Sequence, residues 1–336
     1  MSPITLSPIT RAETSMSRII CITLNPTLDL SNDATKVVPT HKVRVRNQRQ
    51  EVGGGGINVA RVIAELGGDP EVAVLSGGPS GVIMEAMLAD LSLDLHIFPM
   101  AGAVRIAFMV YEEETHLEYR FVPEGPLVSE AEIVPICNLI QTERAGYVVA
   151  SGSLPRGAPV DTYARMAQLT AASGGRFVLD ASGEPLAAAI AGGGIFLFKP
   201  SLSELEKLAG HSLDLPAATA FAGDLVRRGV VHHVALTLGA EGALLVGPDE
   251  TFRMPAIEVP VRSAVGAGDS FVGAMVWALS KGESMHEAFR FGVAAGAAAV
   301  MSPGTELCRR ADILRLYGET CAATHEAPAA VLLARA

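Results

Sequence analysis

The sequence predicts a single α/β domain, with a mainly parallel β-sheet covered by helices on both faces and a small additional sheet. Short apolar runs alternate along the chain with segments that have helical spacing, which is typical of βαβ units. Two further segments are polar and alternating, a pattern that favours strands buried on one face only. Hydrophobic residues make up 49% of the 336 residues, so the chain can bury a large core.

Six apolar runs provide the predicted strands of the main sheet. The first covers residues 18–26 and ends at an Asn-Pro pair, as expected for a buried strand followed by a breaker. Each of the other runs is short and ends in small or polar residues. These five runs cover residues 71–78, 146–153, 176–182, 194–201 and 232–239.

Amphipathic segments between these runs predict the covering helices. They cover residues 58–66, 81–88, 160–172, 203–208 and 217–228. Because ligands of open α/β sheets bind beyond the carboxyl ends of the strands, we expect a site at that edge. The residues at the strand ends there are 25–29, 151–153, 180–182, 199–201 and 238–242, and the turn at 266–269 can join them.

Two segments, residues 29–51 and 105–122, interrupt this alternation and predict a small second sheet. The first includes a stretch in which Val alternates with Arg, and the second reads as a hairpin with a solvated turn at residues 112–114. Its basic residues include Lys42, Arg44 and Arg105. Such a sheet could close over an anionic ligand.

The two ends of the chain differ in composition from the rest. Residues 1–17 are polar and lack the apolar stretch of a signal peptide, so we expect a disordered N-terminal tail. We expect residues 320–336 to form a peripheral C-terminal tail. The packed domain then covers residues 18–319, with the inserted segments at about 29–52 and 103–123.

Charge and cysteine content exclude several classes of protein. The net charge of −10 argues against nucleic-acid binding, which needs clustered Lys and Arg. No apolar run reaches the roughly 18–20 residues of a membrane span. The four cysteines show no C-x-x-C spacing, so we expect free thiols in a reducing cytoplasm rather than disulfides or a zinc site. They are Cys21, Cys137, Cys308 and Cys321.

The turn Gly266-Ala267-Gly268-Asp269 is the strongest chemical signal in the sequence. Its backbone N–H groups and the positive end of the following helix can form an anion hole that needs no lysine. Asp269 is equally compatible with a helix N-cap and with a catalytic base. The glycine spacing does not fit a dinucleotide-binding fingerprint, which argues against a dehydrogenase.

A second glycine-rich run covers residues 51–68 and precedes a predicted helix. Its glycines let a ligand approach the backbone, and Asn58 can offer its amide to a hydroxyl group. The alternative is a flexible hinge with close helix packing.

Together these motifs resemble the ribokinase-like (PfkB) family of sugar kinases. The resemblance covers residues 18 to about 318, and its motifs occur in the family's order. They are TLNPTLD (23–29), GGGGINVAR (53–61), ASGSLPRG (150–157), FKPSLSEL (198–205), TLGAEGAL (237–244), VGAGDSFVGAM (265–275) and FGVAAGAAAV (291–300). The resemblance implies a three-layer α/β/α sandwich with a small β-sheet lid.

The resemblance also implies a role for individual residues. Asp269 matches the catalytic base, and Gly266, Ala267 and Gly268 match the anion hole for the transferred phosphoryl group. The residues that match substrate contacts are Asp29, Gly54, Gly55, Asn58 and Ser153 for the sugar, and Lys42 and Arg105, with Arg44 as a weaker candidate, for its phosphate. Nucleotide contacts are implied for Lys199, Ser201, Thr237, Gly239 and Gly242. Glu204 matches an acid that organises Mg²⁺ through water. A monovalent-cation site, with K⁺ as its candidate ion, is implied at Ser263, Val265, Ala299, Ser302 and Gly304.

Four residues depart from the family pattern. Ser201 replaces an Asn of the K-P-N-x-x-E motif, and Ser203 stands where similar kinases have a Lys near the nucleotide phosphates. Ser302 and Glu306 replace residues that are commonly Asn and Arg. These changes leave the strength of nucleotide and cation binding open.

The resemblance therefore implies an ATP- and Mg²⁺-dependent kinase that phosphorylates the 1-hydroxyl of fructose 6-phosphate. Tagatose-6-phosphate kinase and 1-phosphofructokinase are alternatives within the family. A regulator that binds sugar phosphate and nucleotide without turnover is a more distant alternative. We also expect a cytoplasmic homodimer joined through the small sheet, on which Val43, Val45, Ile106 and Phe108 alternate with polar residues.

Overall fold

The structure is a computed structural model that describes residues 17–302, 304 and 306–326, with the backbone alone for residues 321–326. The predicted N-terminal tail, apart from Ser17, and the last ten residues lie outside these residues. The predicted domain boundary at residue 319 falls inside the final helix, α10 (Arg310–Glu326).

Nine strands form the main sheet in the order β13-β12-β11-β10-β9-β8-β1-β4-β5. All pairs are parallel except β11–β12 and β12–β13, which are antiparallel. The strands are β1 (Ile19–Thr23), β4 (Pro70–Ser76), β5 (Asp94–Pro99), β8 (Tyr147–Ser151), β9 (Arg176–Asp180), β10 (Ile195–Phe198), β11 (Val231–Thr237), β12 (Ala243–Val246) and β13 (Thr251–Met254). The six strands predicted from the sequence are all present, which confirms the mainly parallel sheet.

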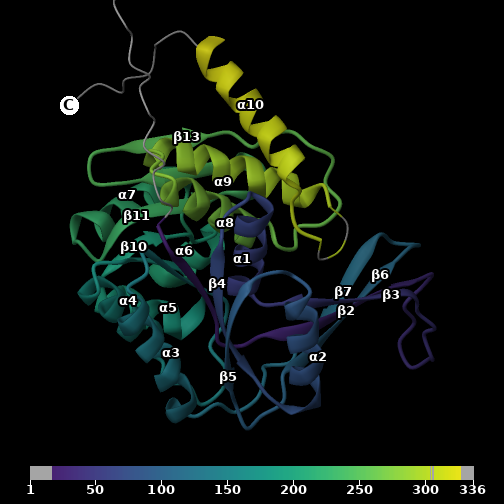
Figure 1. The fold of residues 1–336 in the computed structure, drawn as a ribbon. Coiled ribbons are helices and arrows are strands. Elements are labelled where there is room, and N and C mark those ends of the chain that lie inside the picture. The colour runs from purple at the N-terminus through teal and green to yellow at the C-terminus, as the bar shows by residue number, and fades with distance from the viewer. Residues whose placement is uncertain (1–16, 303, 305, 327–336) are drawn as a thin grey trace, which may run out of the picture.

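Helices cover both faces of this sheet (Figure 1). The helices α3, α4 and α5 pack side by side on one face, and α1, α8 and α9 pack together on the other. The helices other than α10 are α1 (Gly55–Glu65), α2 (Gly78–Ala89), α3 (Glu130–Glu143), α4 (Thr162–Ala172), α5 (Gly183–Gly192), α6 (Leu202–Ala209), α7 (Leu215–Arg227), α8 (Ala267–Ser280) and α9 (Met285–Val300). The five helices predicted between strands correspond to α1, α2, α4, α6 and α7. The three-layer α/β/α architecture is thereby confirmed.

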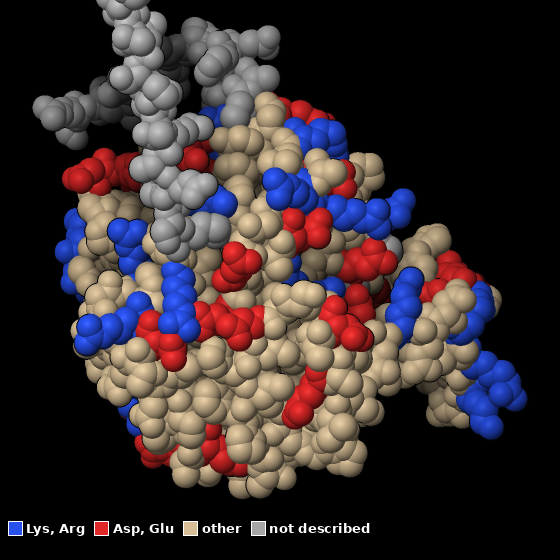
Figure 2. Space-filling view, in the orientation of Figure 1, with Lys and Arg blue, Asp and Glu red and all other residues tan. Residues whose placement is uncertain are grey.

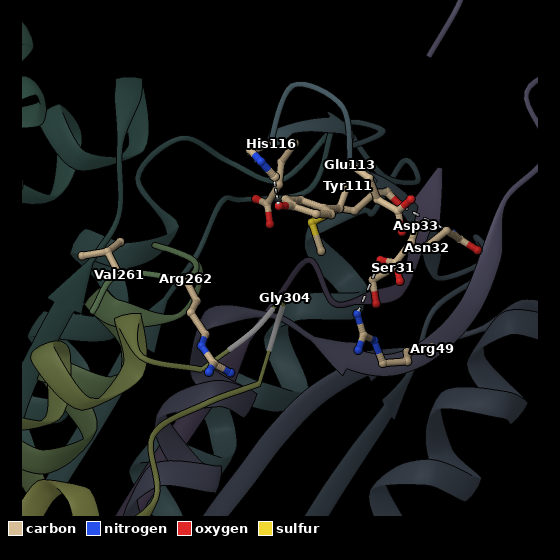
Figure 3. A pocket seen from close by; sticks show the side chains of 12 residues that line it. Ser31, Asn32, Asp33, Arg49, Tyr111, Glu113, His116, Val261, Arg262 and Gly304 are labelled. Carbon is tan, nitrogen blue, oxygen red and sulfur yellow. Dashed lines mark hydrogen bonds and ion pairs between the residues drawn. The ribbon is translucent and has the colours of Figure 1, made fainter. Parts of the chain in front are cut away.

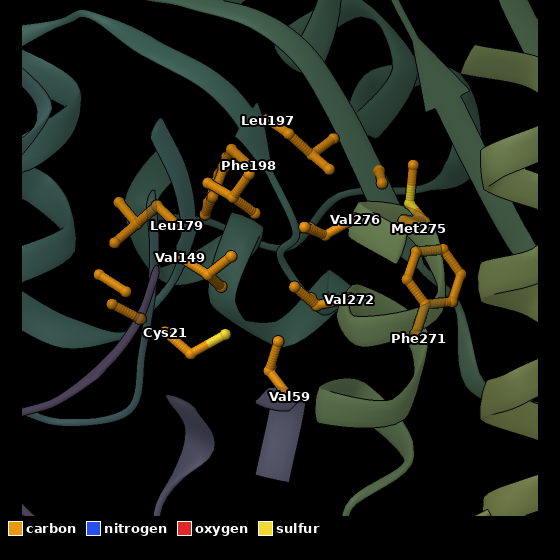
Figure 4. Close-up of a cluster of buried hydrophobic side chains, with 14 of the residues drawn as sticks. Cys21, Val59, Val149, Leu179, Leu197, Phe198, Phe271, Val272, Met275 and Val276 are labelled. Atoms are coloured by element: carbon orange, nitrogen blue, oxygen red, sulfur yellow. The ribbon is translucent and has the colours of Figure 1, made fainter. Parts of the chain in front are cut away.

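The buried core fixes the elements that carry the candidate site. Val59 of α1, Val149 of β8 and Val272 of α8 are fully buried and belong to one apolar cluster, shown in Figure 4. Burying each such side chain contributes about 1.5–3 kcal/mol. Each valine lies within three residues of a polar site residue on the same element, so the core packing sets the relative position of those polar groups.

A four-stranded sheet with the order β3-β2-β6-β7 stands beside the main sheet (Figure 1). Its strands are β2 (Thr27–Ala34), β3 (Arg46–Gly53), β6 (Arg105–Glu112) and β7 (Leu117–Phe121). The two polar segments therefore form the predicted small sheet, and we call it the lid. Asp29 lies near its inner end, where β2 leaves β1 after only three residues.

Two details of the lid differ from the prediction. Residues 42–45 are not part of a strand, because the β2–β3 ladder ends at the pair Asp33–Arg46 and the chain beyond it forms a loop. Glu112 is not solvated but buried, since its carboxylate accepts hydrogen bonds from the Val37 N–H at 2.8 Å and the Thr115 hydroxyl at 2.6 Å. Strand alternation alone does not show where a ladder ends or what a loop folds back to cover.

The surface in Figure 2 shows acidic and basic side chains interspersed over the main domain, with a group of basic residues at the outer end of the lid. Exposed Lys42 and Arg44 belong to the β2–β3 loop at that end. Within the described part of the chain, no helix is long and apolar enough to cross a membrane.

Candidate active site

Asp269 lies where three elements meet beyond the carboxyl ends of the central strands. The side-chain amide of Asn58, in the first turn of α1, donates to Asp269 Oδ2 at 2.9 Å. The hydroxyl of Ser151, the last residue of β8, donates to Asp269 Oδ1 at 3.1 Å. Both carboxylate oxygens are thus engaged by neutral donors, which is the environment of an ionised carboxylate.

Asp269 is not the N-cap of the helix that follows the turn, so this alternative is wrong. Helix α8 begins at Ala267, and its N-cap is Gly266, which has a φ of 73° and no side chain to cap with. A side chain at Gly266 would also meet Leu307, since a Cβ there would lie 2.6 Å from Leu307 Cδ2. Asp269 sits inside the first turn, and its carboxylate accepts from neighbouring elements rather than from its own helix. Its position is compatible with the role of a catalytic base and not with that of a helix cap.

The first turn of α8 contains the residues of the predicted anion hole. The first N–H groups of a helix have no intrahelical partner and carry the positive end of the helix dipole. Gly266, Ala267 and Gly268 supply these groups, next to Asp269. The arrangement can hold an anionic group beside a carboxylate base.

A buried ion pair lies against this turn. Lys199 Nζ is 3.2 Å from Asp180 Oδ1, and the lysine is almost fully buried. A Cβ on Gly268 would lie 3.1 Å from Lys199 Nζ, so the ammonium group borders the anion hole. Although the backbone can form such a hole without a lysine, the structure does bring one to it. Lys199 therefore adds positive charge where a phosphoryl group would sit.

The carboxylates around Lys199 have perturbed pKa values. Burial raises the pKa of Asp180 to about 6, against the opposing charge of Lys199, and the negative charges of Asp269 and Glu204 add to the increase. Burial also raises the pKa of Asp269, while Asn58, Lys199 and Ser151 act to lower it. For Lys199 burial acts to lower the pKa, but Asp180, Glu204 and Asp269 outweigh it and raise the value. The surplus of negative charge suits a divalent cation.

The sugar-side residues gather at the inner end of the lid. Burial raises the pKa of Asp29, while the hydroxyl of Thr27 and the charges of Arg105, Arg120 and Arg61 oppose this. Arg105 is fixed by backbone carbonyls, donating to those of Asn25 and Pro123 at 2.9 Å. Asp29 and Arg105 thus lie together, as a site for a sugar hydroxyl and an anionic group requires.

The loop after β8 and the start of α1 close this side of the site. Asn25 donates from its side-chain amide to Ser153 Oγ at 3.1 Å, which ties the β8 loop to the end of β1. Gly54 is the N-cap of α1, and Gly55 is its first residue. A Cβ on Gly55 would lie less than 3.0 Å from the backbone and side chain of Ser151. Glycine there allows α1 to bring Asn58 up to Asp269.

Lys42 is not brought to this site within one chain. It lies in the loop beyond the outer end of β2, whereas Asp29 is near the inner end. The five steps along the strand from Asp29 to Ala34 alone extend roughly 17 Å at ~3.3 Å per residue. Arg44 lies in the same loop. For either to contact a phosphate held by Arg105, this loop must move or a second copy must supply it.

The nucleotide-side residues surround the start of α6. Ser201 is its N-cap and forms a capping box with Glu204, whose Oε2 accepts from the Ser201 N–H at 2.8 Å and from its hydroxyl at 2.9 Å. The N–H of Thr237 donates to the carbonyl of Pro200 at 2.9 Å. Gly239 and Gly242 bound the short 3₁₀ turn that follows β11. The structure therefore brings Lys199, Ser201, Glu204 and Thr237 together.

The residues matched to a monovalent-cation site lie on the loop before α8, at the end of α9 and on the loop after α9. The N–H groups of Arg262 and Ser263 both donate to the carbonyl of Val300, at 2.7 and 3.4 Å. This joins the segment with Ser263 and Val265 to the end of α9, where Ala299, Ser302 and Gly304 follow one another. The groups offered are carbonyl and hydroxyl oxygens, which suit a hard cation. The structure is consistent with such a site.

A cavity of about 510 Å³ opens between the lid and these loops (Figure 3). Ser31 and Asp33 line it from β2, while Arg262 and Gly304 line it from the main domain, and Arg49 faces Arg262 across it. Its lining includes neither Asp29 nor Asp269. The cavity therefore marks the cleft under the lid rather than the surroundings of Asp269.

Two residues at the centre, Ser151 and Asp180, had no role assigned from the sequence. Both end parallel strands of the main sheet, so the rule that ligands bind at this edge includes them in the candidate region. The charges of Arg61 and Arg120 near Asp29 were also missed. Arg61 ends the motif GGGGINVAR, but the motif does not show that its charge reaches Asp29, and Arg120 lies in no motif; their proximity depends on how α1 and the lid pack.

The buried Asp269 carboxylate, the first N–H groups of α8 and Lys199 lie together at the carboxyl edge of a mainly parallel sheet. This arrangement suits transfer of a phosphoryl group to a hydroxyl. The sequence profile of the pfkB family carbohydrate kinases matches residues 18–312. The chain belongs to this family.

Three relatives with names show which members of the family this chain is similar to. The chain is 39% identical over 303 residues to the ATP-dependent 6-phosphofructokinase isozyme 2 of Mycobacterium tuberculosis (strain CDC 1551 / Oshkosh), which covers 89% of each chain. It is 36% identical over 304 residues to the protein of the same name from Escherichia coli (strain K12), covering 90% of this chain and 98% of that one. A 1-phosphofructokinase from Xanthomonas campestris pv. campestris is 34% identical over 267 residues, covering 77% and 83%.

Solved structures agree with this assignment. Phosphofructokinase-2 from E. coli in complex with potassium superposes with a TM-score of 0.87 at 36% identity, covering 91% of this chain and all of that one. The complex of the same enzyme with fructose-6-phosphate gives a TM-score of 0.85 at 35% identity, covering 90% and 99%. The ribokinase-like fold is thereby confirmed.

Proposed function

We propose that this protein transfers the γ-phosphoryl group of ATP to the 1-hydroxyl of fructose 6-phosphate, giving fructose 1,6-bisphosphate. The observation that carries the proposal is Asp269, held by Asn58 and Ser151 beside the free N–H groups of α8 and beside Lys199. The relatives named 6-phosphofructokinase support the choice of substrate.

In this reaction the sugar hydroxyl lies between Asp269 and the γ-phosphorus. Asp269 takes the proton of the 1-hydroxyl, the sugar oxygen forms a bond to phosphorus, and the bond to the β–γ bridging oxygen breaks to release ADP. The N–H groups at Gly266–Gly268 and the Lys199 ammonium stabilise charge on the phosphoryl oxygens. A positioned base typically contributes about 10²–10⁴-fold to the rate.

The acidic surroundings fit Mg²⁺, which would neutralise charge on the nucleotide phosphates when bound. Glu204 would hold the ion through water. Its Oε2 is engaged by Ser201, and Oε1 remains for a metal-bound water. Ser201 thus keeps Glu204 in place although it replaces an Asn. Ser203 brings no charge of its own, so we expect weaker phosphate binding than a Lys would give.

A monovalent cation, with K⁺ as the candidate, would be bound by oxygens of the loops that adjoin the anion hole. The residues are Ser263, Val265, Ala299, Ser302 and Gly304. The related structure with potassium supports this part of the proposal. The hydroxyl of Ser302 donates to the carbonyl of Leu307 at 3.1 Å, so its oxygen is already oriented by the loop.

We further propose a cytoplasmic homodimer joined through the lid. The strand register puts Ile106, Leu117 and Phe121 on one lid face, turned away from Asp29, and these side chains are 46%, 57% and 59% exposed. Such a cluster of exposed apolar side chains marks an interaction surface. Of the predicted apolar residues, Val43 and Val45 belong to the loop rather than to this face.

An ADP-release assay over a panel of sugar phosphates tests the substrate. Fructose 6-phosphate should give the highest kcat/KM, ahead of tagatose 6-phosphate, fructose 1-phosphate and unphosphorylated sugars. A preference for fructose 1-phosphate would instead favour the 1-phosphofructokinase alternative. The similarity to the 1-phosphofructokinase at 34% identity is the reason to test it. Tight sugar-phosphate binding without ADP release under any condition would support a regulator.

A further inference from the structure

Asp269 receives one hydrogen bond on each carboxylate oxygen, and only the Asn58 donor belongs to a residue expected to contact the sugar. We propose that Ser151 is a positioning residue for the reaction, whose hydroxyl orients the Asp269 carboxylate and keeps it ionised. The inference rests on the proposed role of Asp269 as the base.

The Ser151 hydroxyl lies in a buried position next to the Asp269 carboxylate. Ser151 is buried, and its Oγ donates to Asp269 Oδ1 at 3.1 Å. The first residue of α1, Gly55, packs directly against it and leaves no room for a side chain. Because water has little access, the carboxylate is the partner that satisfies this donor.

The backbone next to Ser151 is clamped on two sides. The Gly152 N–H donates to the carbonyl of Asp180 at 2.9 Å, and the buried Tyr163 hydroxyl donates to the Gly152 carbonyl at 2.9 Å. Ser151 itself pairs with Asp180 in the β8–β9 ladder. The hydroxyl therefore comes from a rigid strand end, which is the support that a precisely placed carboxylate needs.

Two donors leave acceptor capacity for the substrate. An ionised carboxylate has about four acceptor positions, so one position on each oxygen stays available for the sugar hydroxyl. The charged groups that influence Asp269 are Lys199, which favours the ionised form, and Asp180, which couples to it unfavourably. Without the Ser151 donor, only Asn58 and Lys199 would oppose the increase that burial causes in the pKa of Asp269.

The Ser151→Ala variant tests the role. We expect kcat to fall by about 10-fold to 100-fold, as for loss of a hydrogen bond to a charged group, with KM for sugar phosphate changed by less than about threefold. The acid limb of the kcat profile should move to higher pH by roughly half a unit to one unit. A loss of thermal stability or an increase in KM, with kcat and the limb unchanged, would overturn the proposal.

Ser280→Ala is the matched control. Ser280 is also buried, donates from its hydroxyl to the Trp277 carbonyl at 2.7 Å, and ends the same helix that carries Asp269. It lies eleven residues from Asp269, roughly 16 Å along the helix. This variant should keep the wild-type pH profile and kcat; if it shifts them as Ser151→Ala does, the effect is structural.

A measurement without turnover separates this inference from the proposed function. In protein labelled with ¹³C at the aspartate carboxyl carbons, the Asp269 resonance is assigned by its absence in Asp269→Asn. Its titration in the free protein should move to higher pH in Ser151→Ala and stay in place in Ser280→Ala. An unchanged titration would overturn the role of Ser151 even if the wild type is an active kinase, and a shift would support that role whatever the sugar substrate.

Discussion

At the scale of single residues, the site depends on contacts between distant parts of the chain. Asn58 and Asp269 are 211 positions apart, and Ser151 and Asp269 are 118 apart. The glycine-rich motifs pointed to Asn58 and Asp269, because each lies in a turn that only small residues allow. The pairing of Lys199 with Asp180 and the donor Ser151 could not be predicted, since no local pattern records which strand ends face each other.

The pH dependence of activity follows from the carboxylates. Burial raises the pKa of Asp269 above its ordinary value and that of Asp180 to about 6. Each must be ionised, Asp269 to accept a proton and Asp180 to hold Lys199. Activity should therefore be present above these pKa values and lost as pH falls through them, so that kcat/KM declines from about pH 6 downward. Rate profiles in constant ionic strength check this; an acid limb at or below pH 4 would contradict it.

Gly55 is predicted to tolerate no side chain. In Gly55→Ala the new methyl group would collide with Ser151, and overpacking of this kind typically costs about 1–3 kcal/mol. The same collision should displace Ser151 and lower kcat. Gly318→Ala is the control, because Gly318 is exposed inside α10 with open space around it, and alanine there should stabilise by roughly 0.5–1 kcal/mol. Thermal and urea unfolding give the change in the free energy of unfolding for both variants. Equal changes in Gly55→Ala and Gly318→Ala would contradict the predicted collision with Ser151.

At the scale of elements, apolar runs predicted the main sheet because strands buried on both faces are almost wholly apolar. Several elements lacked such a signal: β5 is a half-exposed edge strand, and α3 contains Pro135, which is unfavourable in a helix interior. A capping box at Ser129 and Glu132 nevertheless starts α3. In the lid, strand alternation continued past the end of the ladder, so residues 42–45 were predicted as strand.

The lid face should control assembly. Phe121→Asp places a charge in the exposed apolar face of the lid, which should dissociate the proposed dimer or weaken it by more than about tenfold. Sedimentation velocity at micromolar concentration measures this. Leu314→Asp changes an exposed leucine on α10 and should leave the assembly intact. A wild-type protein that sediments as a monomer would contradict the dimer.

At the scale of the whole molecule, the candidate centre lies at the carboxyl edge of the main sheet, and the lid stands beside that sheet (Figure 1). The cleft under the lid lies between β2 and the loops that carry Arg262 and Gly304 (Figure 3). Family membership accounts for the order of the motifs along the chain, and the core packing of α1, β8 and α8 accounts for their convergence. The central claim is that Asp269 is the base of sugar phosphorylation.

The most direct test of that claim compares Asp269→Asn with the wild type for ADP release with fructose 6-phosphate and for ATP binding. Asn is close in size to Asp and can still meet the Ser151 hydroxyl, but it cannot accept the proton. We expect kcat to fall by at least about 10²–10⁴-fold while ATP affinity changes by less than about threefold. Near-normal turnover of Asp269→Asn would contradict the account.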